Sequence, residues 1–209
     1  SKVSDVSIVV IPATIDRDMP LVGPTIGFDT AINTALSAID NIRDTATTAN
    51  VTHIVEVMGR NCGWLSILAG IGAGAEVAII PEVKIRTTKL AKRVKQQLNK
   101  GKKGCIIILA EGGFKNGGED LAKSLSKTGG LDLRITTLGH IQRGGNPSAA
   151  DRLLASELGI AAVSSLLQGM KNVVVAKPKS KIETIRFEEI LINKVSIDKN
   201  LYGIIESIA

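Results

Sequence analysis

Aromatic side chains are scarce in this sequence: phenylalanine, tryptophan and tyrosine together make up 2% of its 209 residues. A groove for single-stranded nucleic acid needs aromatic rings on which bases stack, so we expect no nucleic-acid partner of that kind. The formal net charge of +6 leaves charge-driven binding of nucleic acid as an alternative, with salt-sensitive affinity as its sign. Anionic small molecules fit the same charge equally well.

Cysteine and histidine are also rare, with two residues of each type. Cys62 and Cys105 lie in apolar or glycine-containing segments, which favours a reducing, cytoplasmic setting. His53 and His140 are far apart in the sequence and belong to no Cys/His cluster, so a zinc-type site is not expected. No apolar run approaches the roughly 18 residues of a membrane span, and we expect no membrane partner.

What the sequence does contain is an alternation of short Val/Ile-rich runs with segments of helical periodicity. This alternation predicts an α/β fold, a three-layer Rossmann-like parallel sheet with helices on both faces. The expected strands are Val6–Ile11, Ile54–Val57, Val77–Ile80, Cys105–Ala110, Arg134–Leu138 and Val173–Ala176.

Apolar stripes at spacings of three or four residues predict helices between these strands. The stripes are Ile32, Leu36, Ile39 and Ile42; then Leu90, Val94 and Leu98; then Leu154, Leu158, Ala162 and Leu166.

The two ends of the sequence differ from this pattern. No element precedes the first expected strand, so we expect it to pair with something outside this chain. After the last strand, "AKPKSKIETIRFEEILINK" is typical of a loop and a short helix. A final helix should follow, with Ser196 or Asp198 as its N-cap.

The stretch "PATIDRD", residues 12–18, puts two carboxylates directly after the first expected strand. Open α/β sheets bind their ligands beyond the carboxyl ends of the strands, so acids here favour a functional site. The alternative is a polar turn made by Thr14 and Asp16, with Asp18 as a solvated neighbour.

A second candidate loop is "EVMGRNCGW", residues 56–64, in which Gly59 and Gly63 flank Arg60. Such a loop presents backbone N–H groups and one guanidinium to an anion at a helix N-terminus. A tight turn with a solvated arginine is the alternative. In "ILAEGGF", Glu111 again ends a strand before two glycines that allow a close approach to the backbone, although it could equally cap a helix.

The stretch "TLGHIQRGGNPSAADR" places His140 and Arg143 three residues apart, before two glycines. One imidazole and one guanidinium within reach of the same point suit a phosphate monoester. The alternative is a core histidine whose hydrogen bonds are satisfied internally.

These motifs together are similar to those of one enzyme family. The stretches "TIDRD", "TIGFDTAINT", "IDNIRDTA", "EVMGRNCG", "GAEVAIIPE", "AEGG" and "LGHIQRGGNPSAADRLLAS" resemble the 6-phosphofructokinase family, in the same order. The resemblance extends from about residue 8 to the C-terminus. It implies transfer of the terminal phosphoryl of ATP, with Mg²⁺, to the 1-hydroxyl of fructose 6-phosphate in glycolysis, and a cytoplasmic enzyme. Pyrophosphate replaces ATP in some members of the family.

The resemblance also implies roles for individual residues. Asp16 would be the base that takes the proton of the attacking hydroxyl. Thr14 would hold the transferring group, and Arg60 would neutralise its charge. Asp18 would lie near the magnesium ion, whose main ligand we expect outside this chain.

The expected sugar-phosphate site comes from several loops and two subunits. Within one subunit its residues would be Thr14, Asp16, Met58, Gly59, Arg60, Glu111, His140 and Arg143. Arg134 would reach in from a neighbour, which implies a homo-oligomer, either a dimer or a tetramer.

A phosphate-bearing effector could also bind. The segment from Lys84 to Lys103 holds nine basic residues and no acid. The resemblance implies an effector site between subunits, formed by Arg43, Glu76, Lys100, Lys102 and Lys103. A lysine-rich solvated turn at "NKGKKG" is the alternative.

Two departures from the family qualify these expectations. Alanine at position 13 favours ATP over pyrophosphate as the donor. A second arginine that grips the sugar phosphate across subunits falls at Val51, so altered substrate affinity is expected.

The glycine-rich nucleotide-binding segments of the family are not found in this sequence. We therefore expect residues 1–18 to be the edge of a nucleotide-binding domain that ends in the catalytic loop. Residues 19–171 would be a sugar-phosphate-binding α/β domain, and residues 172–209 a C-terminal strand and helices. A non-catalytic sugar-phosphate-binding or regulatory module is the alternative, and a pyrophosphate-dependent phosphofructokinase is another.

Overall fold

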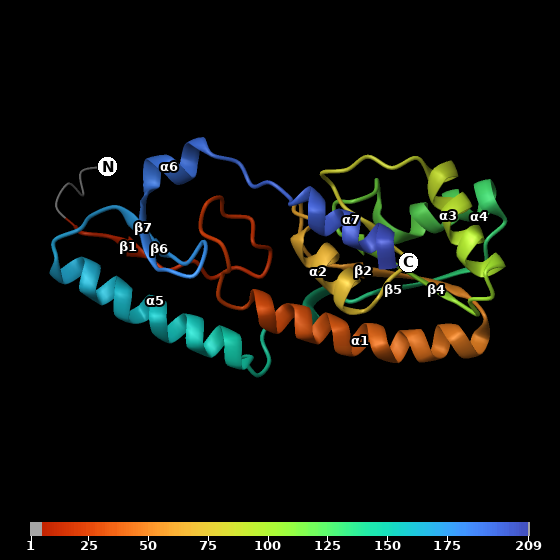
Figure 1. Ribbon diagram of the computed structural model, residues 1–209, viewed down its shortest axis with the longest axis horizontal. Coiled ribbons are helices and arrows are strands. Elements are labelled where there is room, and N and C mark those ends of the chain that lie inside the picture. Colours follow the sequence, from red (N-terminus) through yellow and green to blue (C-terminus); the bar gives the residue numbers. More distant parts are fainter. Residues whose placement is uncertain (1–5, 209) are drawn as a thin grey trace. The chain divides into compact units, whose positions relative to one another are not determined.

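The computed structural model describes residues 6–208, and its chain divides into two compact units (Figure 1). Unit 1 contains the chain up to Thr30 together with Gly145–Ser196. Unit 2 contains Ala31–Gly144 together with the chain from Ile197 onward. Within the described residues, no helix has the length and apolarity that a membrane span requires.

Unit 2 is built on a four-stranded parallel sheet in the order β3-β4-β2-β5. The strands are β2 (Thr52–Val57), β3 (Val77–Ile79), β4 (Cys105–Ala110) and β5 (Leu133–Thr137). Every residue of β4 is buried, because this central strand has helices on both of its faces, and its sequence CIIILA is accordingly apolar throughout.

One face of this sheet is covered by α3 (Thr87–Asn99) and α4 (Gly117–Gly129), which lie side by side (Figure 1). Alternate residues of β4, Ile107 and Leu109 among them, face these helices in one apolar cluster. The predicted stripe on α3 is confirmed at Leu90 and Val94, both fully buried, with Leu98 partly buried.

The opposite face is covered by α2 (Trp64–Gly72) and α7 (Lys199–Ile208), which share a cluster with Ala78 and Ile80. The backbone N–H of Asn200 donates to Oδ1 of Asp198 at 2.8 Å, so Asp198, one of the two residues predicted for this role, is the N-cap of α7.

The long helix α1 (Phe28–Ala49) belongs to unit 2 except for its first three residues. Its fully buried positions are Ala31, Ala35 and Ile39. The predicted stripe is therefore confirmed at Ile39, whereas Ile32, Leu36 and Ile42 are only partly buried and the alanines at positions 31 and 35 occupy the most buried places.

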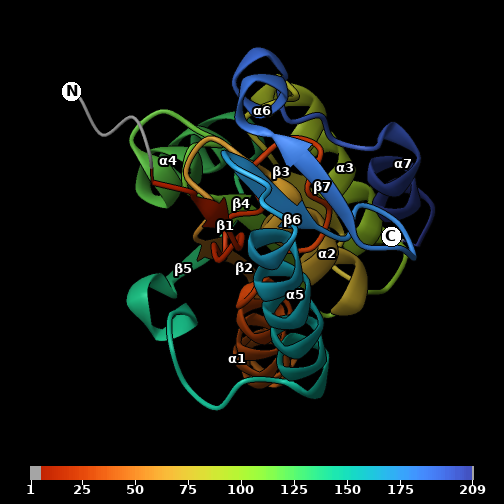
Figure 2. The ribbon, with the colours of Figure 1, turned by 90° about the vertical axis from the view of Figure 1, so that its left-hand side faces the viewer.

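Unit 1 is built on a smaller sheet in the order β1-β6-β7, best seen in Figure 2. Strand β1 (Val9–Val10) pairs in parallel with β6 (Val173–Ala176), and β6 pairs in antiparallel with β7 (Glu183–Arg186). The prediction that the first strand pairs outside the chain is therefore wrong. Two residue pairs make up its ladder, so β1 is also shorter than predicted.

Helix α5 (Ala149–Leu167) covers one face of the small sheet, and α6 (Phe187–Ile192) is part of the cluster on the other. The predicted stripe on α5 is confirmed at Leu154, Leu158 and Ala162 but is wrong at Leu166, which is 43% exposed. At that turn Ser165 occupies the buried side of the helix instead.

Candidate active site

The loop that follows β1 holds an acid that is largely removed from solvent. Asp16 is 6% exposed, and its backbone N–H donates to Oγ1 of Thr14 at 3.1 Å. The Thr14 hydroxyl donates in turn to Oδ1 of Asp18 at 3.3 Å. The polar turn considered as an alternative does form, but it withdraws Asp16 from water and leaves Asp18 exposed.

Two further hydrogen bonds, from residues 25 and 26, hold the backbone of the loop after β1 in place. The hydroxyl of Thr25 donates to the backbone carbonyl of Thr14 at 2.6 Å. The N–H of Ile26 donates to the carbonyl of Pro12 at 3.0 Å. Residues 25 and 26 therefore hold both ends of the turn that leads to Asp16.

The segment around residues 25–30 is itself tied to the start of α5 by Asp151, which is 2% exposed. Its carboxylate accepts hydrogen bonds from the backbone N–H groups of Gly27, at 2.9 Å, and Thr30, at 2.8 Å. It also accepts from the Thr30 hydroxyl. Ser148 caps α5 by accepting from the N–H of Asp151, which completes the connection.

In unit 2, the loop after β2 makes a tight turn at Gly59 and Arg60. The N–H of Cys62 donates to the carbonyl of Gly59 at 2.8 Å. Gly59 has a φ of 134°, and Arg60 has a left-handed φ of 47°, which costs a non-glycine residue on the order of 1 kcal/mol. Met58 is buried, whereas Arg60 is exposed.

The sequence predicted that the helix N-terminus beyond this loop offers its N–H groups to an external anion. For the first of these N–H groups the structure differs. The N–H of Gly63, the N-cap of α2, donates to Oε1 of Glu82 at 2.9 Å. A carboxylate of the chain itself thus occupies that place, because it satisfies an N–H group that the helix leaves unpaired.

The loop after β4 packs directly against the Arg60 turn. The N–H of Arg60 donates to Oε2 of Glu111 at 3.3 Å, and the N–H of Glu111 donates to the carbonyl of Val57 at 2.9 Å. A Cβ atom at Gly112 would collide with the carbonyl oxygen of Arg60, so only glycine allows this approach. Glu111 does not cap α4: the carboxylate that receives the Gly118 N–H belongs to Glu56.

A cleft of about 620 Å³ opens beside these two loops. It is lined by Glu56, Glu111, Phe114, Asn116, Gly117, Gly118, Glu119, Ile135 and Thr137. Three carboxylates and no cation line it, so it suits hydroxyl-bearing groups better than a phosphate.

His140 lies on a 3₁₀ turn, Gly139–Gln142, and the N–H of Arg143 donates to the carbonyl of His140 at 2.9 Å. Both side chains are exposed, so the alternative of a core histidine is wrong. This turn follows β5 and is joined to β2 by a hydrogen bond of 2.9 Å from the N–H of Leu138 to the carbonyl of Glu56.

Arg134 is exposed on β5, an edge strand of the sheet. Its register partner on β2 is His53, whose Nε2 lies 2.8 Å from Oγ1 of Thr136. Burial and, to a smaller extent, the charge of Arg134 lower the pKa of His53. Val51, the residue directly before β2, is 9% exposed and contributes no charge to this part of the sheet.

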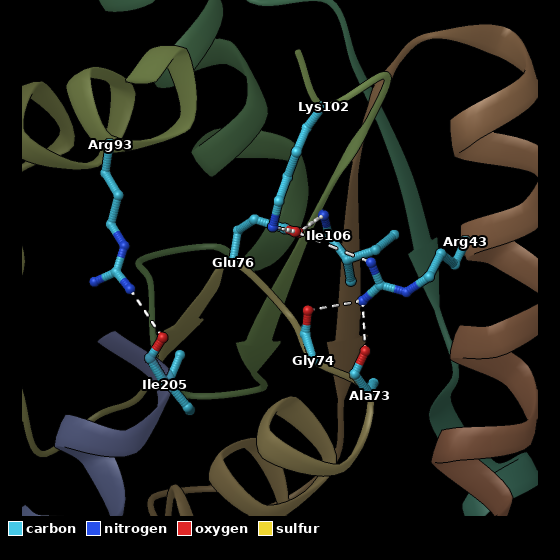
Figure 3. Close-up of polar contacts among 8 residues, drawn as sticks. All are labelled: Arg43, Ala73, Gly74, Glu76, Arg93, Lys102, Ile106 and Ile205. Carbon is cyan, nitrogen blue, oxygen red and sulfur yellow. Dashed lines mark hydrogen bonds and ion pairs between the residues drawn. The ribbon is translucent and has the colours of Figure 1, made fainter. Parts of the chain in front are cut away.

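The residues expected to bind an effector are brought together only in part (Figure 3). Glu76 is 1% exposed, and its Oε1 lies 2.7 Å from Nζ of Lys102 and 4.0 Å from Nη1 of Arg43. Nη2 of Arg43 also donates to the carbonyls of residues 73 and 74, at 2.6 and 3.1 Å. Lys100 and Lys103 are exposed, as a solvated lysine-rich turn predicts.

Between residues 6 and 208, no group of three or more His, Cys, Asp or Glu side chains is arranged to hold a metal ion. Mg²⁺ takes oxygen ligands and often needs only one or two carboxylates besides water and phosphate. Asp18 offers one exposed carboxylate, already an acceptor for Thr14.

Comparison with known proteins gives a consistent result. The family model "Phosphofructokinase" matches residues 1–166. Curated relatives named ATP-dependent 6-phosphofructokinase include one from Clostridioides difficile, 48% identical over 92% of this chain and 60% of its own length. Another, from Brevibacillus brevis, is 44% identical over 95% of this chain and 62% of its own length. The chain thus spans about 60% of these relatives.

Solved structures agree. The phosphofructokinase of Saccharomyces cerevisiae is 34% identical with a TM-score of 0.84, over 97% of this chain and 27% of that one. A pyrophosphate-dependent phosphofructokinase from Marinobacter aquaeolei has a TM-score of 0.78 over 93% of this chain and 55% of its own. At 24% identity it supports the fold alone. The matching family model, the curated relatives and the motifs around Asp16, Arg60 and Glu111 establish that this chain belongs to the phosphofructokinase family.

Proposed function

We propose that this chain supplies the catalytic base and the sugar-phosphate site of an ATP-dependent 6-phosphofructokinase. The observation that carries the proposal is its 48% identity, over 92% of its length, to a relative of that name. The buried acid at the end of β1 and the joined Arg60 and Glu111 loops support it.

In the proposed reaction, the 1-hydroxyl oxygen of fructose 6-phosphate attacks the terminal phosphorus of ATP. The bond from that phosphorus to the bridging oxygen breaks, and ADP leaves with the bonding electrons. Asp16 accepts the hydroxyl proton, and the turn held by Thr14 and Thr25 fixes its backbone. Such reactions depend mostly on positioning the reactants and stabilising charge. One base, one hydroxyl and one guanidinium are therefore enough for the part of the reaction that this chain would carry out.

Arg60 is the residue assigned to charge on the transferring group. Its left-handed backbone and the Glu111 contact at its N–H hold the turn in place, so the side chain extends from a fixed point of the backbone. Mg²⁺ would belong to the donor complex, with Asp18 near it and its main ligand outside this chain.

The sugar-phosphate would be held by Met58, Gly59, Glu111, His140 and Arg143. Arg134 would come from a neighbouring subunit of a homo-oligomer, and its exposure on an edge strand supports that role. A phosphate-bearing effector would meet Arg43, Glu76, Lys100, Lys102 and Lys103. The proposed division into residues 1–18, 19–171 and 172–209 follows these roles, and a cytoplasmic, glycolytic setting goes with them.

A non-catalytic sugar-phosphate-binding module is the second candidate. One observation favours it: Val51, at the position where the family resemblance implies an arginine, is a buried apolar residue. Both candidates predict binding of the sugar phosphate, but only the first predicts turnover.

The test is a calorimetric titration of the purified chain with fructose 6-phosphate, together with turnover assays, with ATP and with pyrophosphate, of a complete enzyme in which this chain is joined to the nucleotide-binding part of a relative. Sugar binding with ATP-dependent turnover supports the first candidate. Binding without turnover by either donor supports the second, whereas turnover with pyrophosphate alone contradicts the ATP assignment. Absence of sugar binding contradicts both candidates.

The matched variant is Asp16→Ser. If Asp16 is the base, this change should lower kcat by about 10²–10⁴-fold and leave sugar binding nearly unchanged. Unchanged turnover would remove Asp16 from the role.

A further inference from the structure

Glu56, the penultimate residue of β2, has a half-buried side chain to which neither the motifs nor the comparisons assign a role. Its Oε2 accepts a hydrogen bond of 2.7 Å from the backbone N–H of Gly118, in the first turn of α4. A carboxylate at a helix N-terminus is also favoured by the helix dipole. This contact ties the end of one strand to a helix 62 positions later in the chain.

The chain leaves room for this carboxylate with two consecutive glycines. A Cβ atom at Gly117 would lie 2.9 Å from Oε2 of Glu56, and one at Gly118 would lie 3.1 Å from it. Both distances are shorter than ordinary van der Waals contact. The Glu56 side chain and the start of α4 are therefore fitted to each other.

The end of β2 thus holds the Glu111 loop at both of its ends. At the near end, the carbonyl of Val57 accepts from the N–H of Glu111 at 2.9 Å. At the far end, the Glu56 carboxylate holds Gly118. The carbonyl of Glu56 also accepts from Leu138, just before the turn that carries His140.

We propose that Glu56 is a positioning residue for the sugar-phosphate site. Its carboxylate fixes the far end of the loop 111–118 and so holds Glu111 beside the Arg60 turn. The identity of the sugar ligand rests on the proposed function, whereas the anchoring of the loop does not. Glu56 acts through Glu111 rather than by touching the transferring phosphoryl group.

The experiment compares Glu56→Ala and Glu56→Gln with a matched control, Glu119→Ala. Glu119 lines the same cleft and carries the same charge, but its carboxylate pairs with Lys123 at 3.9 Å on the exposed face of α4. The readouts are amide hydrogen exchange across residues 111–118, affinity for fructose 6-phosphate by calorimetry, and the melting temperature.

Glu56→Ala should speed exchange of the Gly118 amide and weaken sugar binding by about 10- to 100-fold, the range for one hydrogen bond to a charged group. Glu56→Gln keeps an acceptor oxygen at the same distance from the backbone, so it should retain most of the protection of the Gly118 amide and most of the sugar affinity. Glu119→Ala should change neither. Gly118→Ala gives a second route, because its Cβ would lie 3.1 Å from Oε2 and push the carboxylate away slightly while Glu56 remains, and it should act in the same direction as Glu56→Ala but more weakly.

The outcomes separate this inference from the proposed function. If the unchanged chain does not bind the sugar phosphate, the proposed function fails, and the exchange data alone decide whether Glu56 anchors the loop. If exchange across 111–118 is the same in Glu56→Ala and in the unchanged chain, the inference is overturned. A lower melting temperature with unchanged sugar affinity also overturns it, because Glu56 would then stabilise the fold without positioning the site.

Discussion

The Nζ atom of Lys102 lies 2.7 Å from Oε1 of Glu76, whose side chain is only 1% exposed. The second oxygen of that carboxylate accepts from the N–H of Ile106 on β4 at 2.6 Å. Glu76 is therefore an internal anchor between the start of β3 and the neighbouring strand.

Replacing this anchor should destabilise unit 2. We expect Glu76→Ala to lower the free energy of unfolding by about 2–3 kcal/mol, because a buried N–H loses its acceptor and Lys102 loses its partner. Urea unfolding measures the change. Lys103→Ala, an exposed change in the same basic segment, should cost less than about 0.5 kcal/mol. A similar loss in both variants would contradict the anchoring role.

Asp151 should be equally sensitive in unit 1. Asp151→Ala removes the acceptor for the N–H groups of Gly27 and Thr30, and we expect a loss of about 3 kcal/mol. Asp151→Asn keeps one acceptor oxygen and should lose less. Urea unfolding and the rate of proteolysis within residues 12–30 would report it. Equal stability of the alanine variant and the unchanged chain would contradict this prediction.

The pH dependence of stability should contain a contribution from His53. Its pKa is lowered from 6.5 by burial first and by Arg134 second, so the folded state binds the proton less readily than the unfolded state. The contribution of His53 to the free energy of unfolding is therefore fully present above about pH 6.5 and is lost as the pH drops through the lowered pKa.

His53→Gln should flatten that part of the profile, as followed by urea unfolding between about pH 5 and pH 8. Arg134→Gln should shift the fall only slightly, since burial is the larger cause. Parallel profiles for His53→Gln and the unchanged chain would show that another group is responsible.

Cys105 should be inert toward thiol reagents in the folded protein. Burial first, and the nearby Glu76 charge second, raise its pKa from 9.0 to about 12, so almost no thiolate exists at neutral pH. In a Cys62→Ser variant, a thiol-reactive dye at about pH 7.5 should label the chain only after urea is added. Rapid labelling without urea would show that Cys105 is accessible.

The sequence predicted the strands best where burial on both faces demands continuous Val and Ile. The bounds of β4 and β6 agree with the prediction, and β2, β3 and β5 differ by one or two residues. Strand β7 was missed because only Ile185 of its four residues is buried, which leaves no apolar run to detect. The single expected sheet is two sheets, because strand pairing across distant segments is not encoded in local periodicity.

The residues of the candidate site also fall into two groups, those that the sequence indicated and those that it did not. Asp16, Arg60 and Glu111 stand in motifs at strand ends, where their residue types alone suggest chemistry. Glu56 and Asp151 gave no such signal, since each depends on a contact with a distant residue: Gly118 is 62 positions from Glu56, and Gly27 is 124 positions from Asp151. Only folding brings these pairs together.

The pairing of Val9 with Val173 also has a consequence for how the protein is made. At about 5–20 residues per second, a ribosome needs roughly 10–30 s to synthesise the stretch between these two valines. During that interval β1 and the loop that carries Asp16 have been made, while the strand that completes their ladder does not yet exist. The parallel sheet of unit 2 can form first, so the loop that carries Asp16 should be among the last parts of the newly synthesised chain to become resistant to proteases.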